Sequence, residues 1–220
     1  MIKRIFDFLL SLSGIVISLP LWGLISFLII LENGLPVFYF QERSGKNKTT
    51  FKAIKFRSMV KDAEKNTGAI QAKEDDERIT FVGRILRSTA MDELPQLINI
   101  LRGEMSFVGP RALRPSEKET QGETVKNIYE YPGFEERSKV IPGLTGIAQI
   151  FAPRDISREE KFKFDIFYVR NKSFFLDIYL IFLSFLITFK GKWETREDKF
   201  CFFGEGLKEK VSRGVSKIVL

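Results

Sequence analysis

An apolar segment near the N-terminus limits what this chain can fold into. Lys3 and Arg4 precede it, and no charged residue lies between Asp7 and Glu32. A run of this length is enough for a helix to cross the hydrocarbon core of a bilayer. A cleaved signal peptide is the first alternative, but the run is too long for its apolar region and no Ala-x-Ala-like cleavage site follows. The segment therefore predicts association with a membrane.

A proline interrupts this segment near its middle. The stretch Ser18-Leu19-Pro20 places a ring where a helix needs a backbone N–H, which kinks the axis at a cost of about 3 kcal/mol. Ser18 and Pro20 are therefore the predicted break, where the chain could turn and leave the bilayer on the side it entered. Basic residues precede the segment and recur within residues 43–65, so the positive-inside rule favours both ends in the cytoplasm. A simple kinked span is the alternative.

The rest of the chain is predicted to form a mixed α/β body. Residues 36–42 and 50–58 are typical of a β-hairpin with a polar loop between its strands. Lys55 and Arg57 would project from one face of the second strand, because strand side chains alternate. Further along, helices are predicted over residues 81–87, 157–171 and 173–189. The last of these is apolar and rich in phenylalanine, which suits a helix in the membrane interface or in the core.

The composition limits which ligands and which catalytic residues are possible. The 220 residues include 35 Lys and Arg against 28 Asp and Glu, and the net charge of +7 suits nucleic acid, anionic lipid or a phosphorylated substrate equally well. The chain has no histidine, which excludes Ser-His and Cys-His catalysis and the usual zinc sites. One cysteine, Cys201, excludes an intramolecular disulfide. Any acid, base or nucleophile must be Asp, Glu, Lys, Tyr or Ser.

One stretch in the middle of the chain combines carboxylates with arginines. Asp92 and Glu93 are adjacent, and the apolar spacing after them predicts a helix that begins near Asp92 and ends at Gly103. Free N–H groups and the helix dipole favour anions in the first turn. Three arginines flank this predicted helix start: Arg84, Arg87 and Arg111. Such a place can hold phosphate oxygens in front of a carboxylate, although an N-cap with surface ion pairs is the plainer alternative.

Together these features resemble the small monotopic phosphoglycosyl transferases of the bacterial sugar transferase family. The resemblance holds in order and spacing from about residue 3 to residue 190. It is carried by Lys3-Arg4-Ile5-Phe6-Asp7, Lys55-Phe56-Arg57-Ser58-Met59, Asp92-Glu93-Leu94-Pro95-Gln96-Leu97, residues 101–111, Pro142-Gly143-Leu144-Thr145-Gly146, and Asp165 with Tyr168-Val169. It implies a membrane-associated, monotopic α/β fold with an N-terminal re-entrant helical hairpin, amphipathic interfacial helices and a small β-hairpin or sheet. The implied units are a re-entrant membrane helix (1–34), a cytosolic catalytic domain (35–192) and a C-terminal tail (193–220).

The resemblance also implies an activity. It is the transfer of sugar-1-phosphate from a nucleotide diphosphate sugar, usually a UDP-sugar, to undecaprenyl phosphate, with release of the nucleoside monophosphate. In that family the aspartate of the Asp-Glu pair is the nucleophile, so Asp92 would form a covalent phosphosugar intermediate. Glu93 would help to hold Mg²⁺ or manage the acceptor's proton, and both carboxylates are candidate Mg²⁺ ligands. The candidate phosphate-binding residues are Lys55, Arg57, Arg84, Arg87 and Arg111.

The implied partners are a UDP-sugar, undecaprenyl phosphate and membrane lipid. The implied place is the cytoplasmic face of the inner membrane, at the first membrane step of surface glycan assembly. Nucleic acid is not expected as a partner, and a homodimer is an open alternative. The chain departs from the family pattern at Leu19 before Pro20, at Ala112-Leu113, at Ile147 and at Phe151-Ala152-Pro153-Arg154. The sequence does not choose the sugar.

Two other classes of function fit parts of the sequence. A non-enzymatic membrane anchor would bind anionic lipid through the basic residues 43–65 and recruit glycan enzymes. A glycosyltransferase would move the sugar alone and release a nucleoside diphosphate. The nucleotide that is released, if any, separates these alternatives from sugar-1-phosphate transfer.

Overall fold

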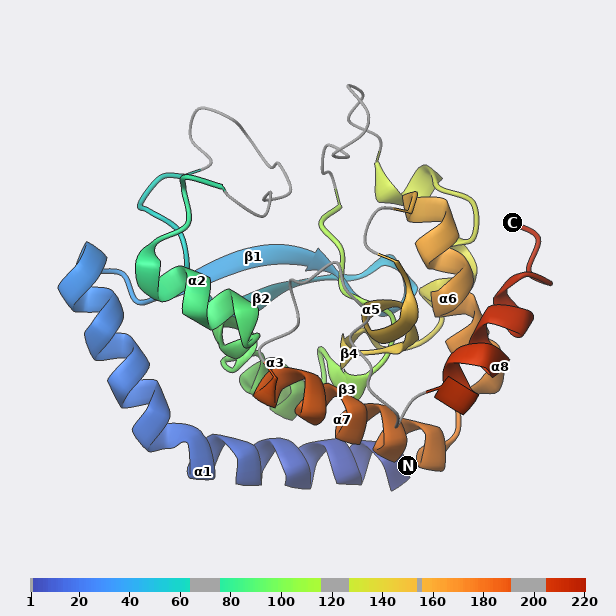
Figure 1. The fold of residues 1–220 in the computed structure, drawn as a ribbon, viewed down its shortest axis with the longest axis horizontal. Coiled ribbons are helices and arrows are strands. Elements are labelled where there is room, and N and C mark those ends of the chain that lie inside the picture. Colours follow the sequence, from blue (N-terminus) through green and yellow to red (C-terminus); the bar gives the residue numbers. More distant parts are fainter. Residues whose placement is uncertain (1, 64–75, 116–126, 154–155, 191–204) are drawn as a thin grey trace.

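A computed structural model describes residues 2–63, 76–115, 127–153, 156–190 and 205–220 (Figure 1). In chain order its elements are α1 (Ile2–Asn33), β1 (Phe38–Ser44), η1 (Lys46–Lys48), β2 (Thr50–Phe56), α2 (Phe81–Ser88), η2 (Met91–Glu93), α3 (Gln96–Arg102), β3 (Ser106–Val108), η3 (Ile128–Glu130), α4 (Phe134–Arg137), β4 (Gly143–Thr145), α5 (Ile147–Phe151), α6 (Arg158–Asn171), α7 (Phe174–Phe189) and α8 (Glu205–Val215). The strands form two sheets of two strands each, β1-β2 and β3-β4. The expected α/β class is therefore confirmed.

Helix α1 is long, apolar and bent. Of the helices in the described ranges, it alone has the length and composition to cross a membrane, and only 11% of its most apolar window is buried inside the protein. Figure 1 shows α1 running along one edge of the molecule and then changing direction near its middle. Pro20 lies inside the helix, and the Ser18 hydroxyl donates to the Gly14 carbonyl oxygen at 2.6 Å. The expected helical hairpin is thus seen as one continuous, bent helix.

The N-terminal end of α1 is attached to the body by two cations. The Lys3 Nζ lies 2.5 Å from the Asp177 Oδ2 of α7. The Arg4 guanidinium donates to the carbonyl oxygens of Ile100 at 2.5 Å and Leu101 at 2.7 Å, in the last turn of α3. The last turn of a helix has carbonyl acceptor capacity to spare and is the negative end of the helix dipole, so a cation is favoured there.

The C-terminal end of α1 is attached to the same body. The Glu32 carboxylate accepts from the backbone N–H groups of Phe81 at 2.7 Å and Val82 at 3.1 Å, the first residues of α2. Arg57, which follows β2, donates to the Asn33 carbonyl oxygen at 2.9 Å. Both ends of the apolar helix therefore meet one folded unit, and Arg57 is engaged at the end of α1 rather than beside Lys55.

The predicted hairpin is confirmed with slightly different limits. Strands β1 and β2 pair antiparallel, with Phe38 opposite Phe56 and Ser44 opposite Thr50. Phe56 is 1% exposed and packs with Trp22 of α1 and Leu86 of α2. This cluster fixes one face of the hairpin against the second half of α1, which leaves the opposite face for polar residues.

The helix expected to begin near Asp92 begins later, and that prediction was wrong. Met91–Glu93 form a single 3₁₀ turn, and α3 starts at Gln96 after Pro95. The cause is Ala90, which adopts the left-handed region at φ 55° and reverses the chain after α2. The predicted end of α3 at Gly103 is confirmed, since this residue has φ 86°.

The helices predicted in the C-terminal half are confirmed as α6 and α7. Helix α7 buries Leu180, Leu183 and Ile187 in a core shared with α5, α6 and α8. Its other face exposes a stripe of large apolar side chains: Phe175, Ile178, Phe182, Phe185 and Phe189. Such a stripe, together with the exposed apolar side chains of α1, is typical of a surface that contacts lipid.

The close packing of α2 on the segment after β2 predicts the effect of one added methyl group. A Cβ on Gly83 would lie 2.0 Å from the Ser58 carbonyl oxygen, so two backbones would have to separate. We expect Gly83→Ala to lower the free energy of unfolding by about 1–3 kcal/mol in detergent. Gly206→Ala in α8 is the control, because its added Cβ would meet no described atom within 4 Å outside its own stretch of helix. Equal melting temperatures for the two variants would contradict this packing.

Candidate active site

Four charged side chains from three separate segments converge on one place. Lys55 comes from β2, Asp92 and Glu93 from η2, and Arg111 from the turn after β3. The Lys55 Nζ lies 2.5 Å from the Glu93 Oε1 and 3.8 Å from the Asp92 Oδ2. The Arg111 Nη2 lies 2.9 Å from the same Glu93 oxygen. The predicted grouping of these residues is therefore seen in the fold.

A buried amide holds β2 against α3 and so fixes Lys55 relative to the carboxylates. Asn99 of α3 is 0% exposed. Its Oδ1 accepts from the Ile54 N–H at 3.0 Å, and its Nδ2 donates to the Lys52 carbonyl oxygen at 2.8 Å and to the Glu104 Oε2 at 2.6 Å. The sequence did not predict this role, because Asn99 is a single polar residue between Ile98 and Ile100 and belongs to no motif.

Two glycines let the turn that carries Arg111 approach a second loop. A Cβ on Gly109 would lie 2.4 Å from the Ile141 carbonyl oxygen, and one on Gly143 would lie 2.0 Å from the Gly109 nitrogen. The two segments pair as parallel strands β3 and β4, with Ser106 opposite Gly143. The loop that follows Pro142 is thus paired with the turn that carries Arg111.

The two adjacent carboxyls have opposite electrostatic environments. Burial raises the pKa of Asp92 from 3.8 to about 6, more than Lys55 and Arg87 lower it. Burial also acts on Glu93, but Arg111 and Lys55 outweigh it and hold the pKa of Glu93 well below its usual range. Burial lowers the pKa of Lys55, and both carboxylates oppose that shift. Glu93 is therefore a fixed anion between two cations, whereas Asp92 is the more basic carboxyl.

This difference gives the two carboxyls different chemical abilities. Glu93 accepts from Lys55 and Arg111 through one oxygen, Oε1, so its charge is already paired with two cations. Asp92 is 9% exposed, and its approach to the Lys55 Nζ is longer than a hydrogen bond, at 3.8 Å. A basic, partly desolvated carboxylate beside cations is able to attack an electrophile that carries negative oxygens.

The remaining predicted cations lie at different places around this pair. Arg87 is half-buried and close enough to favour the charged form of Asp92. Arg84 lies on the exposed side of α2 and shows no contact with either carboxylate. Arg43 of β1, which was not predicted, favours the charged form of Glu93 and donates to the Ala112 carbonyl oxygen at 2.9 Å. In the sequence, Arg43 stood out only as one of the basic residues within residues 43–65.

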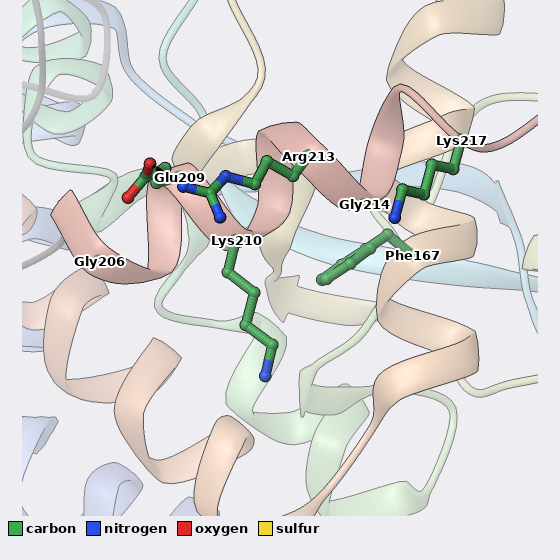
Figure 2. Close-up of a pocket in the computed structure, with 7 residues that line it drawn as sticks. All are labelled: Phe167, Gly206, Glu209, Lys210, Arg213, Gly214 and Lys217. Atoms are coloured by element: carbon green, nitrogen blue, oxygen red, sulfur yellow. Dashed lines mark hydrogen bonds and ion pairs between the residues drawn. The ribbon is translucent and has the colours of Figure 1, made fainter.

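A hollow of about 360 Å³ lies elsewhere, between α6 and α8. Figure 2 shows the side chains around it, with Phe167 from α6, Lys210 and Arg213 from α8, and Lys217 from the turn after α8. It contains neither Asp92 nor any side chain that contacts Asp92. We therefore assign the candidate active site to the four converging residues and not to this hollow.

The chain is similar to several known proteins. A family model described as "Bacterial sugar transferase" matches residues 1–191. The chain is 37% identical over 194 residues to the "Exopolysaccharide production protein ExoY" of Sinorhizobium fredii, covering 82% of each. It is also 37% identical over 194 residues to the "UDP-glucose:undecaprenyl-phosphate glucose-1-phosphate transferase" of Klebsiella pneumoniae, covering 86% of this chain and 40% of that one. A third relative, 36% identical over 184 residues, is the "UDP-N-acetylgalactosamine-undecaprenyl-phosphate N-acetylgalactosaminephosphotransferase" of Aeromonas hydrophila, with 82% and 42% covered.

The raised pKa of Asp92 predicts a stability effect that depends on pH. A carboxyl whose folded pKa lies above its unfolded value stabilises the fold below the unfolded pKa, and loses that stabilisation as pH rises through the folded pKa. With a shift from 3.8 to about 6, ionised Asp92 disfavours folding by up to about 3 kcal/mol above pH 6. We expect Asp92→Asn to raise the melting temperature at pH 8, measured in detergent with a chelator, and to change it little at pH 4. Exposed Glu209→Gln is the control, and a destabilised Asp92→Asn protein at pH 8 would contradict the assignment.

Proposed function

This chain belongs to the bacterial sugar transferase family, and we propose that it transfers a sugar-1-phosphate from a UDP-sugar to undecaprenyl phosphate. As a member of that family it is an enzyme, a sugar-phosphate transferase. The proposed reaction releases UMP and begins the assembly of an exopolysaccharide or another surface glycan on its lipid carrier. The proposal is supported by the activities in the relatives' names and by the Asp92–Glu93 site. The sugar is left unspecified, because one relative's name gives N-acetylgalactosamine and another gives glucose.

The observation that carries the proposal is the contrast between the two carboxyls. In the first step an Asp92 oxygen attacks the phosphorus that bears the sugar, and the bond from this phosphorus to the UMP oxygen breaks with its electron pair leaving on UMP. In the second step an oxygen of undecaprenyl phosphate attacks the same phosphorus, and the bond to Asp92 breaks to restore the carboxylate. Two steps through a covalent intermediate replace one difficult displacement. The paired Glu93 stays ionised and keeps Lys55 and Arg111 in place.

Several cations are proposed to hold the substrate's phosphates. Lys55 and Arg111 already lie within hydrogen-bond reach of one carboxylate, and Arg87 acts on Asp92. A donor diphosphate brings further negative charge beside two carboxylates, so its binding requires such neutralisation. Arg84, exposed on α2, is proposed for the outer part of the donor. Arg57, which donates to backbone at the end of α1, is proposed to act only by holding that end in place.

Mg²⁺ is the proposed cofactor, and the residues present suit it. Among the described residues no group of three or more Asp, Glu, Cys or His side chains could form a complete protein cage for a metal. Mg²⁺ does not need one, because it is commonly held by one or two carboxylates together with substrate phosphates. Asp92 and Glu93 would hold it, and it would supply Lewis-acid stabilisation of the phosphate oxygens. The pKa of Asp92 is raised because the cations now beside it do not offset its burial, so a further cation would be favourable there.

We also propose that α1 is re-entrant and that the catalytic body lies on the cytoplasmic face. A straight helix of this length would reach about 48 Å, so its two ends could not both join one small body. Here Lys3 and Arg4 hold one end, and Glu32 and Arg57 hold the other. The bend near Ser18 and Pro20 makes this double attachment geometrically feasible. A site above the lipid headgroups would then meet both a water-soluble donor and a lipid-borne acceptor.

The released nucleotide tests the reaction. We expect purified protein with Mg²⁺, undecaprenyl phosphate and UDP-sugars to release UMP, and Asp92→Asn to lower that rate roughly 10³-fold or more. Exposed Glu209→Gln should keep the rate of the unmodified protein. Release of UDP would instead support a glycosyltransferase, and no release with any UDP-sugar while lipid binding persists would support a non-enzymatic anchor.

Thiol labelling tests the topology. In a Cys201→Ser background, Ile2→Cys reports the start of α1, and Lys46→Cys reports the body after it. We expect an impermeant maleimide to label neither position in right-side-out spheroplasts and both after permeabilisation. Labelling of position 2 but not of position 46 in sealed spheroplasts would contradict re-entrance and support a kinked span.

A further inference from the structure

A buried ion pair joins α4 to α6. Arg137 and Asp165 are 4% and 3% exposed, and the Arg137 Nε lies 2.8 Å from the Asp165 Oδ2. The guanidinium carbon also lies 4.6 Å from the centre of the Phe162 ring and 5.6 Å from that of Phe134. A buried charge is tolerated only when such partners satisfy it, so the geometry of this guanidinium is narrowly defined.

The same guanidinium reaches the turn that carries Arg111. The Arg137 Nη2 donates to the Arg111 carbonyl oxygen at 2.6 Å. The Arg111 side chain in turn reaches Glu93 at 2.9 Å. A continuous series of contacts therefore leads from Asp165 through Arg137 to Arg111 and then to Glu93, although Arg137 itself contacts neither carboxylate of the site.

Helix α6 holds the other end of this turn as well. The Lys3 Nζ donates to the Val108 carbonyl oxygen at 3.0 Å and to the Tyr168 hydroxyl oxygen at 3.2 Å. The Tyr168 hydroxyl lies 3.2 Å from the same carbonyl oxygen and donates to the Asp177 Oδ1 at 2.7 Å. Asp165 and Tyr168 are three residues apart, so they lie on the same side of α6. The carbonyl oxygens of Val108 and Arg111 are thus each bound by a cation that also contacts α6, Lys3 through Tyr168 and Arg137 through Asp165.

We propose that Arg137, itself oriented by Asp165, is a positioning residue that sets the place of Arg111 at the active site. This inference rests on the proposed function of the Asp92 site. An arginine can satisfy Asp165 and the Arg111 carbonyl at once, because its guanidinium presents several N–H groups in fixed directions. A lysine keeps the charge opposite Asp165 but offers a single nitrogen, so it cannot reproduce both contacts in the same geometry.

A double-mutant cycle tests the link between the two arginines. We expect Arg137→Lys to lower kcat/KM for UMP release roughly tenfold in the unmodified background and less than twofold in an Arg111→Ala background, because the residue on which it acts is then absent. Equal losses in the two backgrounds would overturn the proposal. Arg170→Met is the matched control: it removes an exposed ion pair between the same helices, Arg170 Nε to Glu136 Oε1 at 2.7 Å, and should leave the rate unchanged.

A second measurement does not require turnover. We expect hydrogen–deuterium exchange in peptides covering residues 107–113 to rise in Arg137→Lys but not in Arg170→Met, because only the first change releases the Arg111 carbonyl. Unchanged exchange there would overturn the positioning role even if Arg137→Lys were less active. If the unmodified protein releases no UMP, the proposed function fails, while the exchange result still decides whether Arg137 holds the turn.

Discussion

The double ion pair of Glu93 is the interaction on which the rest of the site depends. It joins β2, η2 and the turn after β3 through Lys55 and Arg111, three segments that are distant in the sequence. Two adjacent carboxylates at low exposure would otherwise repel one another and disfavour folding. Because Glu93 takes up both cations, Asp92 is left with the longer contact to Lys55, and burial raises the pKa of Asp92 more than Lys55 and Arg87 lower it. One carboxylate thus stabilises the arrangement and the other is available for chemistry.

The membrane helix is part of the same arrangement. Helix α1 packs on α3, where a Cβ on Gly14 would lie 3.3 Å from the Leu97 Cδ1. Helix α3 directly follows the turn that carries Asp92, and its Asn99 fixes β2 and hence Lys55. The apolar segment, which has the length and composition to cross a membrane, therefore also supports the site through α3. In the proposed reaction, this support would keep Asp92 at a constant distance from an acceptor phosphate at the headgroup level.

Much of the fold and of the candidate site was predictable from the sequence, wherever local patterns determine the structure. The apolar segment, the β1-β2 hairpin, α2, α6 and α7 follow from hydropathy and spacing, and the grouping of Lys55, Asp92, Glu93 and Arg111 follows from the motifs. The 3₁₀ turn at Met91–Glu93 did not follow, because it depends on the left-handed backbone of Ala90, which no residue preference indicates. The roles of Arg57, Asn99 and Arg137 depend on carbonyl groups far away in the chain, and the parallel pairing of β3 with β4 is also non-local. Long-range polar contacts of this kind leave no periodic signal.

The central claim is that Asp92 becomes covalently bonded to the sugar phosphate. The most direct test incubates the protein with Mg²⁺ and a UDP-sugar that it uses, without undecaprenyl phosphate, followed by acid quench and peptide mass spectrometry. We predict a mass increase of one sugar phosphate on the peptide that contains Asp92, formed together with an equal amount of UMP and discharged when undecaprenyl phosphate is added. An unmodified peptide, or no UMP before the acceptor is added, in a protein that turns over normally with the acceptor would contradict the account.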